Sequence, residues 1–132
     1  MDPSRALAAV ALASVAWDGV MGSAGARALR HSLDYRSPYR ERSDQEMIAL
    51  MNDLLLSLKA QGAEALLLEA GAALDGPQRL TAFAMATEIM RSDGPLVEEE
   101  QRILDHLSEA LELSADETST IMEVMNILHA SL

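Results

Sequence analysis

An acidic turn in the second half of the chain carries the residues best suited to chemistry. Asp93 opens an Asp-Gly pair, and Glu100 follows seven residues later, beside Glu99. In a helix beginning near Val97, Glu100 falls on the same face as the apolar residues. A carboxylate turned toward a core must be paired, hydrogen-bonded or neutral. Because carboxylate and backbone oxygens are the ligands of hard cations, Asp93, Glu99 and Glu100 are candidate metal ligands.

The same residues have a purely structural interpretation. Asp93 could cap a helix, and Glu100 could accept hydrogen bonds from exposed backbone amides of the turn. We favour this alternative, because turn signatures of this kind are usually structural. The cofactor is then either a divalent cation (Ca²⁺, Mn²⁺ or Zn²⁺) or none.

The sequence offers no recognised catalytic constellation. An EF-hand loop starting at Asp93 would need acidic residues where Pro95 and Val97 stand, and a glutamate where Leu104 stands. None of the three histidines has a glutamate three residues before it, as a ferritin-like di-iron site requires. HExxH, P-loop and GxSxG motifs are absent as well. We therefore expect a protein that is not an enzyme.

The Asp-Gly turn occurs twice, 75 residues apart, and this repeat indicates the architecture. The segment from Ala9 to His31 aligns with the segment from Ala84 to His106. The identical pairs are Ala9/Ala84, Ala11/Ala86, Asp18/Asp93, Gly19/Gly94, Arg27/Arg102, Leu29/Leu104 and His31/His106. Asp18 is a further candidate metal ligand. Its copy has Gly25 at the position of Glu100 and so lacks the second carboxylate.

The pattern of apolar residues and helix signals predicts an all-α fold of about seven helices and no strand. Good helix starts are Asp2-Pro3 and the capping boxes at Ser43 and Ser114. The expected helices span about residues 2–17, 23–33, 43–61, 63–74, 77–92 and 97–111, with a last one after residue 114. They form one domain over residues 1–132, with helix–turn–helix pseudo-repeats at about 3–34 and 77–111.

Composition and charge narrow the partner classes. Apolar residues make up 49% of the chain, cysteine is absent and the net charge is −11. Up to Gly62 there are seven acidic and seven basic residues, whereas from Ala63 onward there are fourteen and three. Such a surface repels phosphate backbones and anionic membranes, so we expect no nucleic acid and favour cations or proteins. The apolar run Ala6–Ala16 is too short to span a bilayer, and we expect a cytoplasmic protein.

The segment from Tyr35 to Arg40 is the second candidate site. It reads YRSPYR, contains Pro38 and is expected to form a connecting loop. Tyrosine and arginine side chains can hold anionic groups by hydrogen bonding and stacking. We expect a solvated loop here, whose Tyr35, Arg36, Tyr39 and Arg40 are the first choice for a partner-binding surface.

The repeat, the Asp-Gly turn and the acidic helix start resemble the tellurite-resistance TerB family. In that family a glutamate follows the turn aspartate by seven residues, as Glu100 follows Asp93, and Leu96 stands at an apolar family position. The resemblance implies a seven-helix bundle of two pseudo-repeats, an acidic divalent-metal site and a role in stress-response complexes. The same fold occurs in the N-terminal region of some DnaJ-type co-chaperones.

These observations lead to two functional hypotheses. The first is a non-enzymatic, TerB-like module of the stress response that binds a divalent cation at its acidic turns and a protein partner through a charged face. The alternative is a metal-free interaction or adaptor domain, as in the co-chaperone relatives. The sequence leaves the oligomeric state open, and a homodimer is one arrangement it allows.

Overall fold

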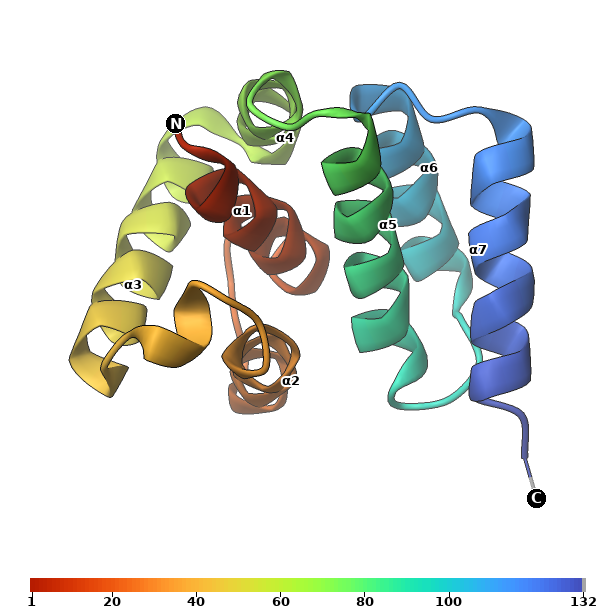
Figure 1. The fold of residues 1–132 in the computed structure, drawn as a ribbon, viewed down its shortest axis with the longest axis horizontal. Coiled ribbons are helices and arrows are strands. Elements are labelled where there is room, and N and C mark those ends of the chain that lie inside the picture. The colour runs from red at the N-terminus through yellow and green to blue at the C-terminus, as the bar shows by residue number, and fades with distance from the viewer. Residues whose placement is uncertain (132) are drawn as a thin grey trace.

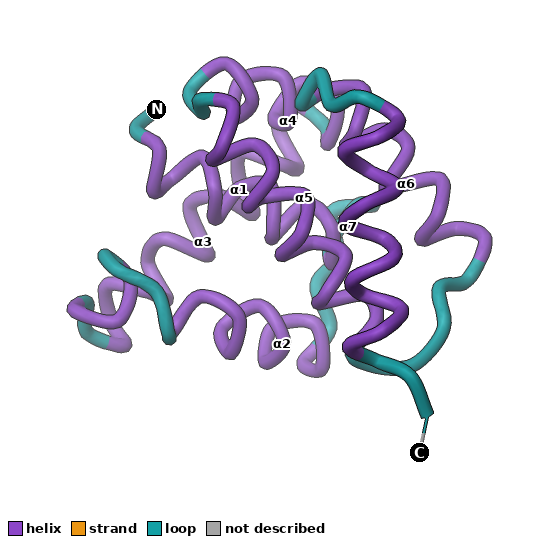
Figure 2. The backbone as a smooth tube through the Cα atoms, turned by 45° about the vertical axis from the view of Figure 1, so that its right-hand side comes forward, coloured by secondary structure: helices purple, strands orange, loops and turns teal. Residues whose placement is uncertain are grey.

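A computed structural model describes residues 1–131 and has, within that range, seven α-helices, one 3₁₀ turn and no strand. The prediction of an all-α fold with about seven helices is thereby confirmed (Figure 1). No helix in the described part is both long and apolar enough to cross a membrane. The elements are α1 (Pro3–Val15), α2 (Ser23–Asp34), η1 (Tyr39–Glu41), α3 (Asp44–Gln61), α4 (Ala63–Ala72), α5 (Gly76–Arg91), α6 (Glu98–Ala110) and α7 (Ala115–Leu128). Short loops join most of these helices (Figure 2).

Polar caps set the starts of most helices. The Asp2 carboxylate accepts a hydrogen bond from the Arg5 amide at 2.8 Å, with proline in the first turn. The predicted capping boxes at Ser43 and Ser114 both form. A third, at Asp75, starts α5 at Gly76, one residue earlier than expected.

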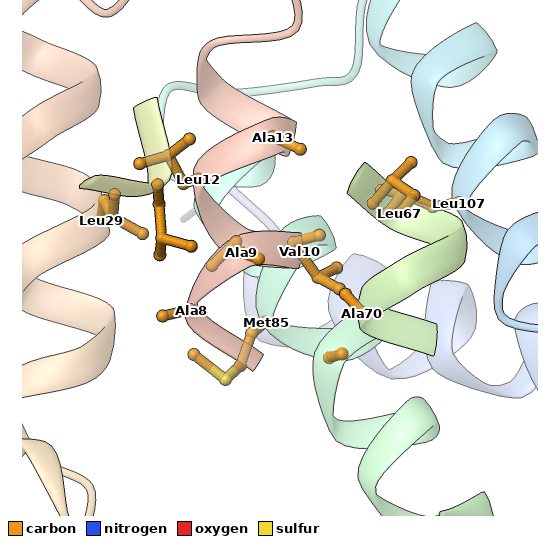
Figure 3. Packing of buried hydrophobic residues seen from close by; sticks show 14 of the residues in the cluster. Ala8, Ala9, Val10, Leu12, Ala13, Leu29, Leu67, Ala70, Met85 and Leu107 are labelled. Carbon is orange, nitrogen blue, oxygen red and sulfur yellow. The ribbon is translucent and has the colours of Figure 1, made fainter. Parts of the chain in front are cut away.

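Helix α1 lies at the centre of the bundle and packs against α2, α3, α4, α5 and α6 (Figures 1 and 3). Residues 8–13 of this helix are at most 1% exposed. Four of these six are alanines, whose small side chains let neighbouring helices approach closely. Val10 and Leu12 fill the remaining space, and in Figure 3 they lie among Leu29, Leu67, Ala70 and Leu107 of the surrounding helices. The first repeat thus supplies the core around which the other helices assemble.

The sequence repeat is also a repeat of backbone structure. Gly19 and Gly94 both have positive φ, 87° and 127°, which glycine adopts without steric cost. Each donates its amide to the carbonyl three residues before it, at 2.8 Å to Ala16 and at 3.0 Å to Arg91. Helices α2 and α6 begin at Ser23 and Glu98, which are again 75 residues apart. The two turns therefore end and restart their helices in the same way.

Helix α7 is attached to the edge of the bundle. It packs mainly on α5, and Met125 is its only buried residue within the described part of the chain. Val124, Ile127 and Leu128 are 52%, 77% and 60% exposed. Polar residues, among them Asp105 and Glu123, line a cleft between α6 and α7. Helix α7 is therefore held by few apolar contacts.

Two boundaries differ from the prediction. Helix α1 ends at Val15 instead of Trp17, because the next amide, from Ala16, makes the last helical hydrogen bond and the chain then turns toward Gly19. The loop expected over residues 34–43 contains a 3₁₀ turn at Tyr39–Glu41. The turn forms because the Tyr39 ring is buried and draws this part of the loop onto the bundle.

Candidate functional site

The second Asp-Gly turn uses its glutamate for helix capping. Glu100 is half-buried, and its carboxylate accepts a hydrogen bond from the Val97 amide at 3.1 Å. This is the amide bond of the structural alternative described above. Asp93 is exposed and is not the cap, since Val97 occupies that position. Glu99 lies exposed in the first turn of α6, where the positive end of the helix dipole favours an acid.

The first Asp-Gly turn holds its aspartate locally. The Asp18 carboxylate accepts a hydrogen bond from the Val20 amide at 3.1 Å and is otherwise exposed. A side chain at Gly25, the counterpart of Glu100, would meet Val15 at 3.4 Å. The glycine therefore lets the start of α2 approach the end of α1.

The candidate metal ligands do not form a donor set. A hard cation such as Ca²⁺ takes six to eight oxygen ligands. Within residues 1–131, no three histidine, aspartate or glutamate side chains are grouped so that they could hold a metal. Glu100 is engaged with the Val97 amide, and Asp18 with the Val20 amide. The residues of the turns do not fit a cation in this arrangement.

Beside the first turn, three residues from different helices form a small polar contact. The Trp17 ring lies 5.4 Å from the His106 ring, centroid to centroid, with an angle of 34° between the planes. His106 Nδ1 is 3.3 Å from the Glu64 carboxylate. The side chains of His106 and Glu64 are 47% and 72% exposed, so this contact joins α1, α4 and α6 at the surface.

The predicted partner-binding loop divides into an exposed and a buried part. Tyr35 is 72% exposed and Arg36 is exposed beside it. Tyr39 does not belong to the surface, because its ring is 1% exposed and its hydroxyl donates to the Ser4 carbonyl. Burial raises the pKa of Tyr39 from 10.0 to about 12. Arg40 is exposed and pairs with its neighbour Glu41 at 3.2 Å.

Tyr35 and Arg36 border a groove between α2 and α5, two helices that pack against each other. One cleft of about 680 Å³ and a second of about 560 Å³ share His31, Ser32 and Glu88, and together we name them the α2–α5 groove. The lining of the first cleft is mainly apolar. Its further residues used below are Arg27, Ala28 and Ile89 in the first cleft, and Tyr35, Arg36, Ala84, Met85 and Met125 in the second.

Charges are distributed unevenly around this groove. Arg30 is neutralised by Asp34 at 3.3 Å and Asp44 at 3.0 Å, and the hydrogen bond to Asp44 raises its pKa. Arg27 and Arg36 have no ion pair with any residue of the described range 1–131. Glu88, on the α5 side, has none within that range either. The α2 wall therefore carries free positive charge and the α5 wall one free negative charge.

The sequence gave no direct indication of the α5 half of this groove. Residues 85–90 are buried except for Glu88, which stands exposed in the middle of the run. A single acid in an apolar helical stretch was the available signal, since such a residue must face solvent or a partner. Its position opposite α2 depends on how distant segments pack, which helical periodicity does not report.

No family model, curated protein or solved structure matches the chain. The resemblance to the TerB family therefore stays a prediction that rests on the Asp-Gly repeat and Glu100. The argument for function has to come from the surface of the molecule.

Proposed function

We propose that this chain is a non-enzymatic, TerB-like helical module of the cytoplasmic stress response that binds another protein in the α2–α5 groove. The observation that carries the proposal is the groove itself, with the exposed Tyr35 and the unpaired Arg36 at its edge. This role corresponds to the adaptor alternative, in which no metal takes part.

The composition of the groove supports a protein partner. Tyrosine and arginine are enriched among the residues that contribute most to protein–protein affinity, because they combine a large contact area with hydrogen bonding. Tyr35 is packed edge-on against His31, with 5.2 Å between the ring centroids and an angle of 83° between the planes. The contact limits the freedom of an otherwise exposed ring, so less conformational entropy is lost on binding.

The geometry of the turns supports the metal-free form of the proposal. Glu100 and Asp18 bind backbone amides, and Asp93 and Glu99 are exposed. Calorimetric titration of the chelator-treated protein with Ca²⁺, Mn²⁺ and Zn²⁺ tests this directly. We expect no saturable binding. One-to-one binding that both Asp93→Ala and Glu100→Ala abolish would assign a cation site to the second turn and overturn the metal-free form.

Blocking the groove tests the proposal as a whole. The chain contains no cysteine, so Ser32→Cys can be labelled at one position with a bulky maleimide. Ser32 lines both clefts, and the label would fill the groove. Asn52→Cys, exposed on α3, carries the same label as the matched control.

The assay is a selection of helical peptides displayed at random sequence on the unlabelled protein. We expect most enriched peptides to bind the protein labelled at position 52 and to lose binding to the protein labelled at position 32. Peptides that bind both labelled proteins equally, or a selection that enriches none, would contradict a binding function of the groove.

A further inference from the structure

We propose that the partner segment is an amphipathic α-helix with an acidic flank, which lies in the α2–α5 groove with its acidic side toward α2. This inference rests on the proposed function and specifies the chemistry of the partner. Apolar contact, free positive charge and the position of Glu88 together define the segment.

The walls of the groove favour a helix over an extended peptide. Both walls are helices, and the described residues contain no strand whose edge an extended peptide could extend. The α5 lining runs from Ala84 to Ser92, which is about 12 Å at a rise of about 1.5 Å per residue. Two to three turns of helix match that length, and their apolar stripe would lie on Ala28, Ala84 and Met85.

Arg27 and Arg36 set the sign of the partner's charge. Arg27 lines the first cleft and Arg36 the second, so the free positive charges border both parts of the groove. Neither is neutralised by an acid of the described residues, whereas Arg30 between them is paired twice. Carboxylates on a docked helix would therefore find two guanidinium groups with donors to spare.

Glu88 sets the direction in which the acidic flank points. Its carboxylate is exposed on the α5 wall. The chain from Ala63 onward, which includes α5 and α7, holds fourteen acids and three bases. An acidic flank turned toward α5 would meet like charge, whereas the same flank turned toward α2 meets Arg27 and Arg36. Exposed charges beyond about 8 Å are screened at physiological salt, so these local pairs decide the orientation.

Two peptides test the charge directly. Each has 16 residues and the same apolar stripe, taken from the selected groove binders, with glutamates on one flank of the first and lysines in their place on the second. We expect the glutamate helix to bind about tenfold more tightly, since two exposed ion pairs replace two repulsive ones. The difference should shrink at high salt.

Variants at exposed positions assign the effect to its residues. Arg27→Gln with Arg36→Gln should remove the preference for the glutamate helix, and Glu88→Gln should strengthen its binding. Arg40→Gln is the matched control, because Arg40 is exposed and pairs with Glu41 outside the groove. Opposite effects at the arginines and at Glu88 separate charge recognition from loss of folding.

The outcomes distinguish this inference from the function on which it rests. Equal or tighter binding of the lysine helix, still blocked by the Ser32 label, would overturn the acidic partner and leave the groove as the binding site. Binding of neither helix would overturn the acidic partner as well, while the display selection judges the groove. Self-association of the unlabelled protein that the Ser32 label abolishes would assign the groove to a second copy instead.

Discussion

Replacing Tyr39 by phenylalanine should change the stability of this protein in opposite directions at neutral and alkaline pH. At pH 7 the substitution removes the hydrogen bond from the Tyr39 hydroxyl to the Ser4 carbonyl. A hydrogen bond of this kind contributes about 0.5–1.5 kcal/mol, so we expect the free energy of unfolding to fall by about 1 kcal/mol.

At alkaline pH the sign reverses. The pKa of Tyr39 is 10.0 when the ring is solvated and about 12 in the folded protein. Between these values the unfolded chain releases the proton more readily, so the stabilising effect is complete below pH 10 and disappears as the pH rises to 12. The loss amounts to about 2 to 3 kcal/mol in the wild type, at about 1.36 kcal/mol per unit. Tyr39→Phe cannot ionise and keeps its stability over this range.

Urea unfolding followed by circular dichroism from pH 7 to pH 11.5 measures both effects. The stability curves of wild type and Tyr39→Phe should cross above pH 10. Tyr35→Phe makes the same chemical change on a ring that is 72% exposed, and it should follow the wild type throughout. An alkaline limb of equal slope in Tyr39→Phe and wild type would refute the buried position of Tyr39.

Three further predictions concern the fold. Gly71→Ala should destabilise by about 1–3 kcal/mol, because the new Cβ would lie 3.0 Å from the Ala110 carbonyl oxygen. Gly76→Ala, with open space around it, should stabilise by about 0.5–1 kcal/mol; equal effects in thermal unfolding would contradict this. Amides of α7 should exchange with deuterium faster than those of α1, and equal protection would show that α7 is held more firmly than its contacts suggest. His106→Ala should change the emission of Trp17, whereas an unchanged spectrum would place the two rings apart.

The regular part of the fold could be predicted because its signals are local. Capping residues at Asp2, Ser43 and Ser114 mark helix starts through bonds to amides three residues away. The Asp-Gly pairs end helices because glycine reaches positive φ. The repeat also predicted that both turns share one geometry.

The candidate site was harder to predict because it depends on contacts between distant segments. Tyr39 and Tyr35 have similar neighbours in sequence, yet one ring bonds to Ser4 and the other faces solvent. No local pattern distinguishes them, since the difference arises where the loop meets the start of α1. Glu88 likewise belongs to the groove only because α5 packs beside α2.

The most direct test of the central claim is a chemical-shift map of the ¹⁵N-labelled protein titrated with the glutamate helix. The account predicts that the largest shifts fall in two segments, residues 27–36 of α2 and its following loop, and residues 84–92 of α5 and the turn after it. Shifts of similar size in α3 or α6, with these two segments unaffected, would contradict it.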